Sequence, residues 1–218
     1  MSLLVNEGER RTAHQLVRDT LRRAILTGRI PGGERLVQAD LAQQMRVSTT
    51  PVREALRDLA AEGLIRLDAH RGAIVHEPSQ AELEEIYRIR QLLEPEVMER
   101  AIERISEDDI EEAAQILRLA DEEHDPTAWV DLNRQFHRVF TRVAGAPRLA
   151  GIVETLQDSA TMYIVAALTH GTRSTDEANA QHWQLLEAVR ARDIDSARHT
   201  MIAHIHTTLE SVPELPER

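Results

Sequence analysis

The chain has 218 residues, of which 42% are hydrophobic and 29% are charged, a composition typical of a soluble globular protein with one or two domains. It contains no cysteine, which excludes disulfides and thiolate metal sites, and no apolar run long enough to span a membrane. We therefore expect a cytoplasmic protein. The net charge is −11, but residues 1–77 carry 12 arginines against 10 acidic residues, a net of +2, and residues 78–218 carry 14 against 27, a net of −13. This asymmetry predicts two domains with different partners.

The first domain, residues 1–77, shows the pattern of helices followed by a hairpin. Apolar residues keep a helical period from Arg10 to Thr27, and the glycines and proline of TGRIPGGERL end that helix. QADLAQQM predicts a short helix, RVS a tight turn, and STTPVREALRDLAAEGLI a second helix that stops at Gly63. LIRL and AIV predict a small β-hairpin with Gly72 at its tip. This order of elements is that of a winged helix-turn-helix.

A winged helix-turn-helix places the second helix of its pair in the major groove of DNA, where the first residues of that helix reach base edges and phosphates. Hydroxyl groups can bind phosphate or base, and an arginine can pair with guanine or clamp a phosphate. An arginine beside a glycine at the tip of the wing can reach the minor groove or the backbone. The candidate DNA-binding residues are Arg35, Ser48, Thr49, Thr50, Arg53, Arg71 and Gly72. For any one of them a purely structural role is the alternative.

The second domain, residues 78–218, begins after the interrupting stretch HEPSQ, and its pattern is helical throughout. The expected helices cover residues 80–104, 107–123, 127–144, 148–168, 175–192 and 196–211. Pro95 lies inside the first of them and is expected to kink or split it. Ser106, Asp125 and Asp195 are expected to cap helix N-termini. The predicted fold class is mainly α: a winged helix-turn-helix followed by an all-helical antiparallel bundle.

The stretch GRIPGGERLVQADLAQQMRVSTTPVREALRDLAAEGLIRLDAHRGAIV resembles the DNA-binding domain of the GntR family of bacterial transcription regulators. The match covers about the first third of the chain and includes the PG turn, the TPVREAL helix start and the RG wing. It implies that this domain binds operator DNA. Thr49 stands where the family usually has arginine, so one common contact is missing and the preferred operator is expected to differ.

Most of residues 80–206 resemble the FCD domain, the all-helical ligand-sensing module of the FadR-like subfamily of GntR regulators. The matching residues are Arg90 and Glu94 in RQLLE, Asn133 and His137 in NRQFH, His182 in HWQLLEAVRARD, and His204 in MIAHI. The resemblance implies that this domain binds an effector, binds a metal and forms a homodimer.

The chemistry of these side chains fits a divalent transition metal. Asn133 and His137 stand at positions i and i+4 of one helix, so both can reach one ion, and His182 and His204 complete the predicted set of ligands. Neutral imidazole suits zinc, nickel, copper or iron, of which we expect zinc or nickel. Such a site leaves coordination positions open for a carboxylate, which Arg90 is expected to bind from the other side. The amide of Asn133, where the family commonly has aspartate, adds no charge and predicts weaker metal binding.

The sequence therefore predicts a homodimeric bacterial regulator, not an enzyme, whose affinity for operator DNA is controlled by a small organic acid at a metal site. Two alternatives stay open. In the first, the regulator has no metal and binds an apolar acyl ligand, the histidines being hydrogen-bonded core residues and Arg90 an intrahelical partner of Glu94. In the second, the protein is a metal-dependent enzyme acting on a small organic acid. Against the enzyme, no carboxylate is placed as an obvious general base beside the histidines.

Overall fold

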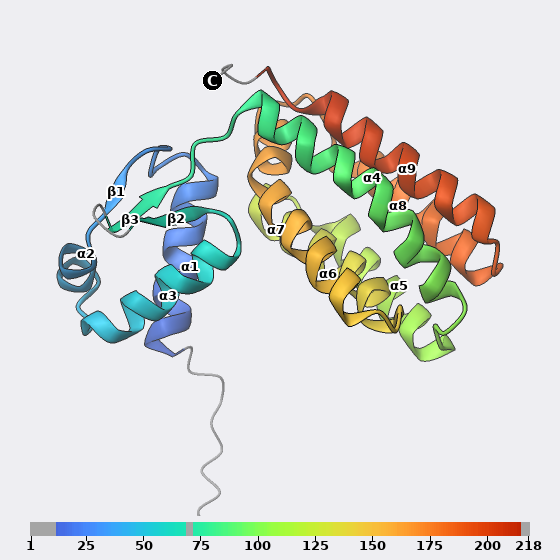
Figure 1. Cartoon of the computed structure of the whole chain (residues 1–218), viewed down its shortest axis with the longest axis horizontal. Helices are drawn as coiled ribbons and strands as arrows, with labels where there is room; N and C mark the ends of the chain where they lie inside the picture. The colour runs from blue at the N-terminus through green and yellow to red at the C-terminus, as the bar shows by residue number, and fades with distance from the viewer. Residues whose placement is uncertain (1–11, 69–71, 215–218) are drawn as a thin grey trace, which may run out of the picture. The chain divides into compact units, whose positions relative to one another are not determined.

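The computed structural model describes residues 12–68 and 72–214, and the chain divides into two compact units between Glu77 and Pro78 (Figure 1). The described part is mainly helical and contains one three-stranded sheet, so the predicted fold class is confirmed. None of the helices in this part is both long enough and apolar enough to cross a membrane. The predicted wing residue Arg71 lies outside the described residues.

The first unit is built on two helices that pack together, α1 and α3. Its elements are α1 (Ala13–Leu26), β1 (Arg35–Leu36), α2 (Gln38–Met45), α3 (Thr49–Ala61), β2 (Ile65–Asp68) and β3 (Gly72–Val75). The hydroxyl of Thr12 caps α1. Val17 and Leu21 on α1 and Val52 and Leu56 on α3 are buried, each pair spaced by one helical turn. This apolar face holds α3 with its first turn exposed to solvent.

The sheet of the first unit has the antiparallel order β1-β3-β2. The hairpin of β2 and β3 was predicted, but β1 was not, because a two-residue strand leaves no alternating pattern in the sequence. Gly72 has a φ of +81° and pairs with Asp68, so it begins β3 and is not the tip of the turn as predicted. Between α2 and α3 the backbone turns at Arg46, which has a φ of +55°.

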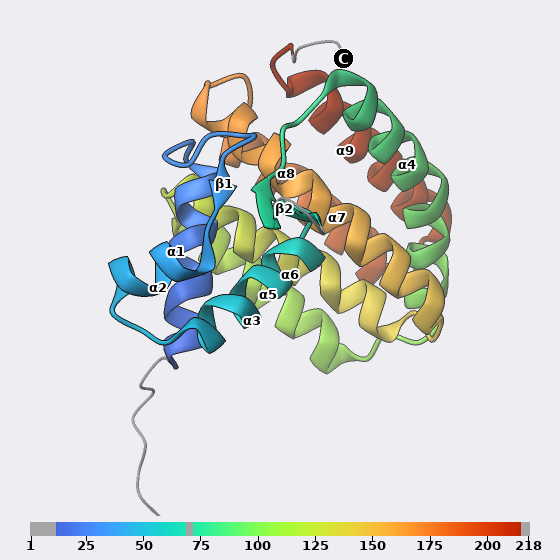
Figure 2. The ribbon, with the colours of Figure 1, turned by 60° about the vertical axis from the view of Figure 1, so that its left-hand side comes forward.

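The second unit is a helical bundle. Its described helices are α4 (Gln80–Ile102), α5 (Glu107–Glu122), α6 (Pro126–Val143), α7 (Pro147–Thr169), α8 (Thr175–Arg190) and α9 (Ile194–Ser211). They adjoin in the cyclic order α4, α9, α8, α5, α6, α7, and α6 also contacts α4. Figures 1 and 2 show α4 and α9 running side by side. The bundle therefore brings residues from opposite ends of the domain's sequence into one core.

Two local predictions for the second unit need correction. Of the two effects predicted for Pro95, a kink or a split, the split does not occur, because α4 continues through it to Ile102. The N-cap of α9 is Asp193 instead of Asp195, and its carboxylate accepts a hydrogen bond from the backbone N–H of Ser196. The other predicted caps, Ser106 and Asp125, are confirmed.

The helical spacing of three histidines places their side chains toward the core of the bundle. On α6, His137 lies seven residues after the buried Val130, which is two helical turns. On α8, His182 lies four residues after the buried Ala178, and on α9, His204 lies three residues after the buried Met201. Each histidine thus continues an apolar stripe into the core.

Candidate metal centre and nucleic-acid interface

His137, His182 and His204 meet in the core of the second unit. Each offers one nitrogen, and the three nitrogens lie within 4.8 Å of one another. The ring centroids are 4.6 Å apart for His182 and His204, 5.1 Å for His137 and His182, and 5.4 Å for His137 and His204. All three side chains are buried, with exposed fractions of 1–5%. Three imidazoles from three helices therefore converge on one point, as a metal centre requires.

The hydrogen bonding of these rings is incomplete. Both ring nitrogens of His137 and both of His182 are buried without a hydrogen-bond partner in the described part of the chain. In His204, Nδ1 lies 3.0 Å from Oε1 of Gln181, a contact that leaves Nε2 available to a ligand. Buried polar atoms nearly always have hydrogen-bond partners or ligands, so four unpartnered nitrogens indicate that a bound partner is missing here. A hydrogen-bonded core histidine, the simplest alternative, does not describe His137 or His182.

Burial also keeps the three rings neutral. It lowers the pKa of His137 to about 4, where the nearby Glu94 carboxylate raises the pKa and the Arg90 guanidinium lowers it. Burial lowers the pKa of His182 and of His204 well below 6.5, and the neighbouring histidines lower both further. Neutral imidazole is the form that binds metal, so at neutral pH no proton has to leave these rings first.

The same pKa shifts predict how stability depends on pH in the metal-free protein. An unfolded histidine takes up a proton near pH 6.5, whereas the folded His137 stays neutral down to about pH 4. The unfolded state therefore binds more protons in this window, and the free energy of unfolding should fall by about 1.4 kcal/mol per pH unit for each such imidazole as the pH drops from 6.5. Urea unfolding of chelator-treated protein at pH 7, 6 and 5 measures this fall. His137→Ala should show a shallower dependence, and equal slopes for parent and variant would refute the argument.

A small cavity adjoins the histidine cluster. Its lining comprises Arg90, Trp129, Asn133, Ile164, Arg173, Ala178, His204 and Thr208. The volume open to the centre of a water molecule is about 10 Å³, close to the space that one water needs. Asn133 is half-buried and lies in this lining together with His204, one of the three clustered histidines. Arg90 also lies there, as its predicted role in binding an effector requires.

Arg90 belongs to a buried polar network on one side of this cavity. Its Nε donates to Glu94 over 2.6 Å, so the intrahelical pair that the sequence allowed does form. The other oxygen of Glu94 accepts from Gln157 on α7, and the guanidinium carbon of Arg90 lies 4.8 Å from the ring centre of Tyr87. One terminal nitrogen of Arg90, Nη1, is buried and has no partner among the described residues. Arg90 is thus oriented by its helix and still has a donor to offer.

Arg173, which the sequence analysis missed, also lines the cavity. It lies in the loop between α7 and α8, and its Nη2 donates to Oε1 of Gln181 over 2.9 Å. The same oxygen faces Nδ1 of His204, so Gln181 links this arginine to a clustered histidine. A single arginine in a loop has no periodic pattern, so the sequence gives no signal for it.

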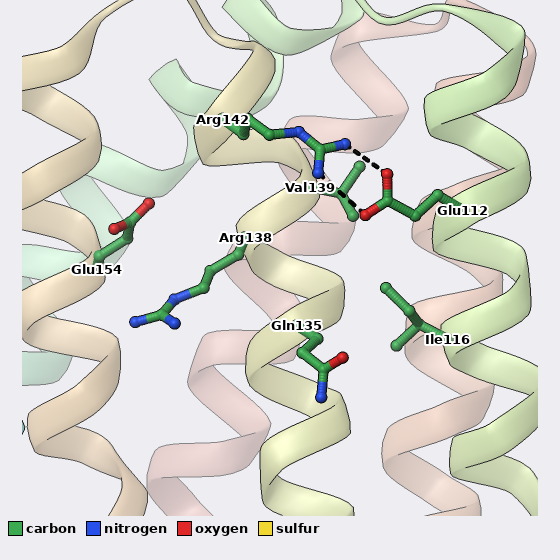
Figure 3. A pocket seen from close by; sticks show the side chains of 7 residues that line it. All are labelled: Glu112, Ile116, Gln135, Arg138, Val139, Arg142 and Glu154. Carbon is green, nitrogen blue, oxygen red and sulfur yellow. Dashed lines mark hydrogen bonds and ion pairs between the residues drawn. The ribbon is translucent and has the colours of Figure 1, made fainter. Parts of the chain in front are cut away.

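A larger hollow lies elsewhere on the second unit. It has a volume of about 500 Å³ and is lined by Glu112, Ile116, Gln135, Arg138, Val139, Arg142 and Glu154 (Figure 3). Arg142 there forms an ion pair with Glu112 over 2.6 Å, and the hollow contains no histidine. It shares no lining residue with the histidine cluster, so its size alone does not make it the functional site.

In the first unit, the predicted DNA-binding side chains that the structure describes lie at the surface. The exposed residues are Arg35, Ser48, Thr49, Thr50, Arg53 and Gly72. Ser48 occupies the N-cap position of α3, yet its side chain forms no capping hydrogen bond. Its hydroxyl and the first backbone N–H groups of α3 therefore remain available to a phosphate. Arg53 follows on the next turn.

Two family descriptions match the two units of this chain. The family described as "Bacterial regulatory proteins, gntR family" matches residues 13–75, and the FCD domain matches residues 85–207. The chain belongs to the GntR family and carries an FCD domain. The histidine cluster and the cavity beside it lie inside the FCD match.

The relatives of this GntR regulator also act in transcription. The transcriptional repressor RspR of Escherichia coli K12 is 28% identical over 205 residues, which cover 93% of this chain and 90% of the repressor. The crystal structure of a GntR family regulator from Pseudomonas syringae matches with 30% identity and a TM-score of 0.56, covering 91% of this chain and 84% of that one. Escherichia coli McbR/YncC has the same fold, with a TM-score of 0.67 at 23% identity and coverages of 90% and 95%. The chain is therefore a bacterial transcription regulator, and none of these relatives is described as an enzyme.

Proposed function

We propose that this regulator binds operator DNA as a homodimer in the cytoplasm, and that a small organic acid bound beside a metal ion controls its affinity for that DNA. The single observation that carries the proposal is the cluster of three buried, neutral imidazoles beside a cavity with two arginines. The DNA-binding half rests on the exposed start of α3 and on the GntR match.

The residues present fit a divalent transition metal. His137, His182 and His204 would hold it, and Asn133 would add an amide oxygen from the turn before His137. Three imidazoles favour zinc or nickel over magnesium or calcium, which prefer oxygen ligands. When bound, the metal supplies open coordination positions for an oxygen of the effector. Because the Asn133 amide is uncharged, it does not neutralise the positive charge of the metal, and an anionic effector would do so.

Arg90 would hold the carboxylate of that effector. It is buried and already oriented by Glu94 and Tyr87, so little conformational entropy is lost when an anion binds. Its unpartnered Nη1 is the donor that a carboxylate oxygen would accept from.

The metal-free alternative, an apolar pocket for an acyl chain, gains no support from the structure. The cavity beside the histidines has room for about one water, and two arginines and an asparagine are among the residues that line it. An acyl chain would need a larger and more apolar space.

We propose a homodimer because of the way such domains read DNA. Two recognition helices related by a two-fold axis would match the two halves of a pseudo-palindromic operator. The effector can change DNA affinity only as far as it binds the two states of the dimer with different affinity.

The proposal is tested by measuring operator affinity with and without metal. DNA duplexes selected from a random pool by the purified protein serve as operator, and fluorescence anisotropy gives the Kd at one fixed salt concentration. We expect at least one acid from a panel of short carboxylic and hydroxy acids to change the Kd of zinc-loaded protein by about 5- to 150-fold, the usual range of coupling between two sites. Chelator-treated protein should show no such change. An equal response of both forms would refute the metal's role, and a failure to select any DNA would refute the DNA-binding role.

A further inference from the structure

Arg173 is a buried cation that forms no ion pair within the described ranges, although the carboxylate of Glu177 lies near enough to act on its charge. Its side chain is 5% exposed, and Nη1 has no hydrogen-bond partner within the described ranges. Its Nη2 bonds to the neutral amide of Gln181, and within the same ranges it forms no ion pair with a carboxylate. Burial lowers the pKa of this guanidinium more than the nearby Glu177 carboxylate raises it, although an arginine stays charged at any physiological pH. A buried unpaired charge is costly, so a residue held in this way indicates a missing anion.

Arg90 differs from Arg173 in this respect. The Glu94 carboxylate, 2.6 Å from its Nε, already balances its charge. Both arginines nevertheless line the same cavity, and each has an unpartnered Nη1. Two guanidinium groups from different elements, α4 and the loop before α8, therefore offer donors to one space.

The charge of the cavity lining is one-sided. Of its eight residues, two are arginines and none is acidic, and Asn133 is an amide where an aspartate would have brought a negative charge. A divalent metal on the adjoining histidines would make the space more positive still. A ligand with one carboxylate could bind both the metal and Arg90, but Arg173 would then have no anion to pair with.

We infer that Arg173 binds a second anionic group, so that the effector of this regulator is a small dianion such as a dicarboxylate. The inference rests on the proposed function and names the class of its effector. The cavity has room for only about one water, so its lining side chains must move to admit a ligand, which favours a short acid over a long one. Because Gln181 contacts both Arg173 and His204, an anion bound to Arg173 would also affect the position of His204 in the histidine cluster.

The test compares acids that differ only in the second carboxylate. Succinate is paired with butyrate, and malate with 3-hydroxybutyrate, each titrated into the zinc-loaded full-length protein by isothermal calorimetry. We expect the better dicarboxylate to bind at least about 30-fold more tightly than its monocarboxylate counterpart, the effect of pairing a buried charge. Arg173→Gln should remove most of that preference and change the monocarboxylate affinity by less than about threefold. Arg173→Lys keeps the charge and should keep part of the preference.

Arg190→Gln is the matched control, because Arg190 is exposed at the end of α8 and pairs with Glu187 on the surface. It should leave both affinities unchanged. Equal affinity for the two members of each pair, an equal loss of both acids in Arg173→Gln, or no binding by any dicarboxylate to zinc-loaded protein would overturn the inference. Failure of the protein to retain zinc at all would overturn the proposed function, and that result is read from zinc content before any acid is added.

Discussion

His182→Ala is expected to bind zinc more than about 100-fold more weakly than the parent protein. Loss of a partner that merely supports a metal ligand already costs 10- to 100-fold in affinity, and this change removes a ligand itself. His182 lies close to both of the other rings, with centroid distances of 4.6 Å to His204 and 5.1 Å to His137. Competition for zinc with a chromophoric chelator at pH 7.5 measures the difference.

His199→Ala is the control for this experiment. His199 lies on α9, as His204 does, but it is exposed and its Nδ1 contacts the backbone oxygen of Asp195. Its removal should leave zinc affinity unchanged. If the two variants lost affinity equally, or if His182→Ala kept the parental affinity while remaining folded by circular dichroism, the cluster would not be the zinc site.

Arg53→Ala is expected to weaken operator binding by about 10- to 100-fold, the usual effect of removing an arginine that contacts a base. Arg53 is exposed one turn inside α3, the helix that we propose as the recognition helix. Anisotropy titration at constant salt measures the loss. Comparing several operator sequences shows whether Arg53 reads a base, which gives a loss that depends on sequence, or clamps a phosphate, which gives a uniform loss.

Arg118→Ala provides the comparison, since Arg118 is exposed on α5 of the second unit and pairs with Glu111. It should bind operator like the parent. An unchanged affinity in Arg53→Ala, or an equal loss in Arg118→Ala, would remove α3 as the reading helix.

The helices were predictable because their apolar residues repeat with the helical period and their ends carry capping residues. Ser106 and Asp125 were found in this way. Asp193 and Asp195 both lie at the start of α9, and a spacing pattern does not tell which carboxylate reaches the backbone N–H groups. A proline inside a helical pattern predicts either a kink or a split, and α4 is not split at Pro95.

The histidine cluster was predictable only through the resemblance to a known domain. His182 is separated from His137 by a whole helix, α7, so no spacing rule joins them. The structure adds what the resemblance lacked, namely that these rings are buried, close together and short of hydrogen-bond partners. Arg173 could not be predicted as a site residue for a different reason. Its proposed role depends on the contact with Gln181, and this contact exists only because of how the loop before α8 packs.

The histidine cluster also explains why α6 combines an apolar face with polar nitrogens. Phe136 and Phe140 are buried in the core, and the ring of Phe136 packs edge-on against His137 at a centroid distance of 5.4 Å. Such an environment keeps the imidazole neutral, so its nitrogens can bind a metal. The apolar and polar features of this helix therefore serve the same site.

The metal content of the full-length protein, expressed without a histidine tag, tests the central claim most directly. Elemental analysis by inductively coupled plasma mass spectrometry, after dialysis against zinc or nickel and then against metal-free buffer, should find close to one metal ion per chain. Protein that retains no metal after this treatment, while remaining folded, would show that His137, His182 and His204 form no metal centre, and that control by a metal-bound acid is wrong.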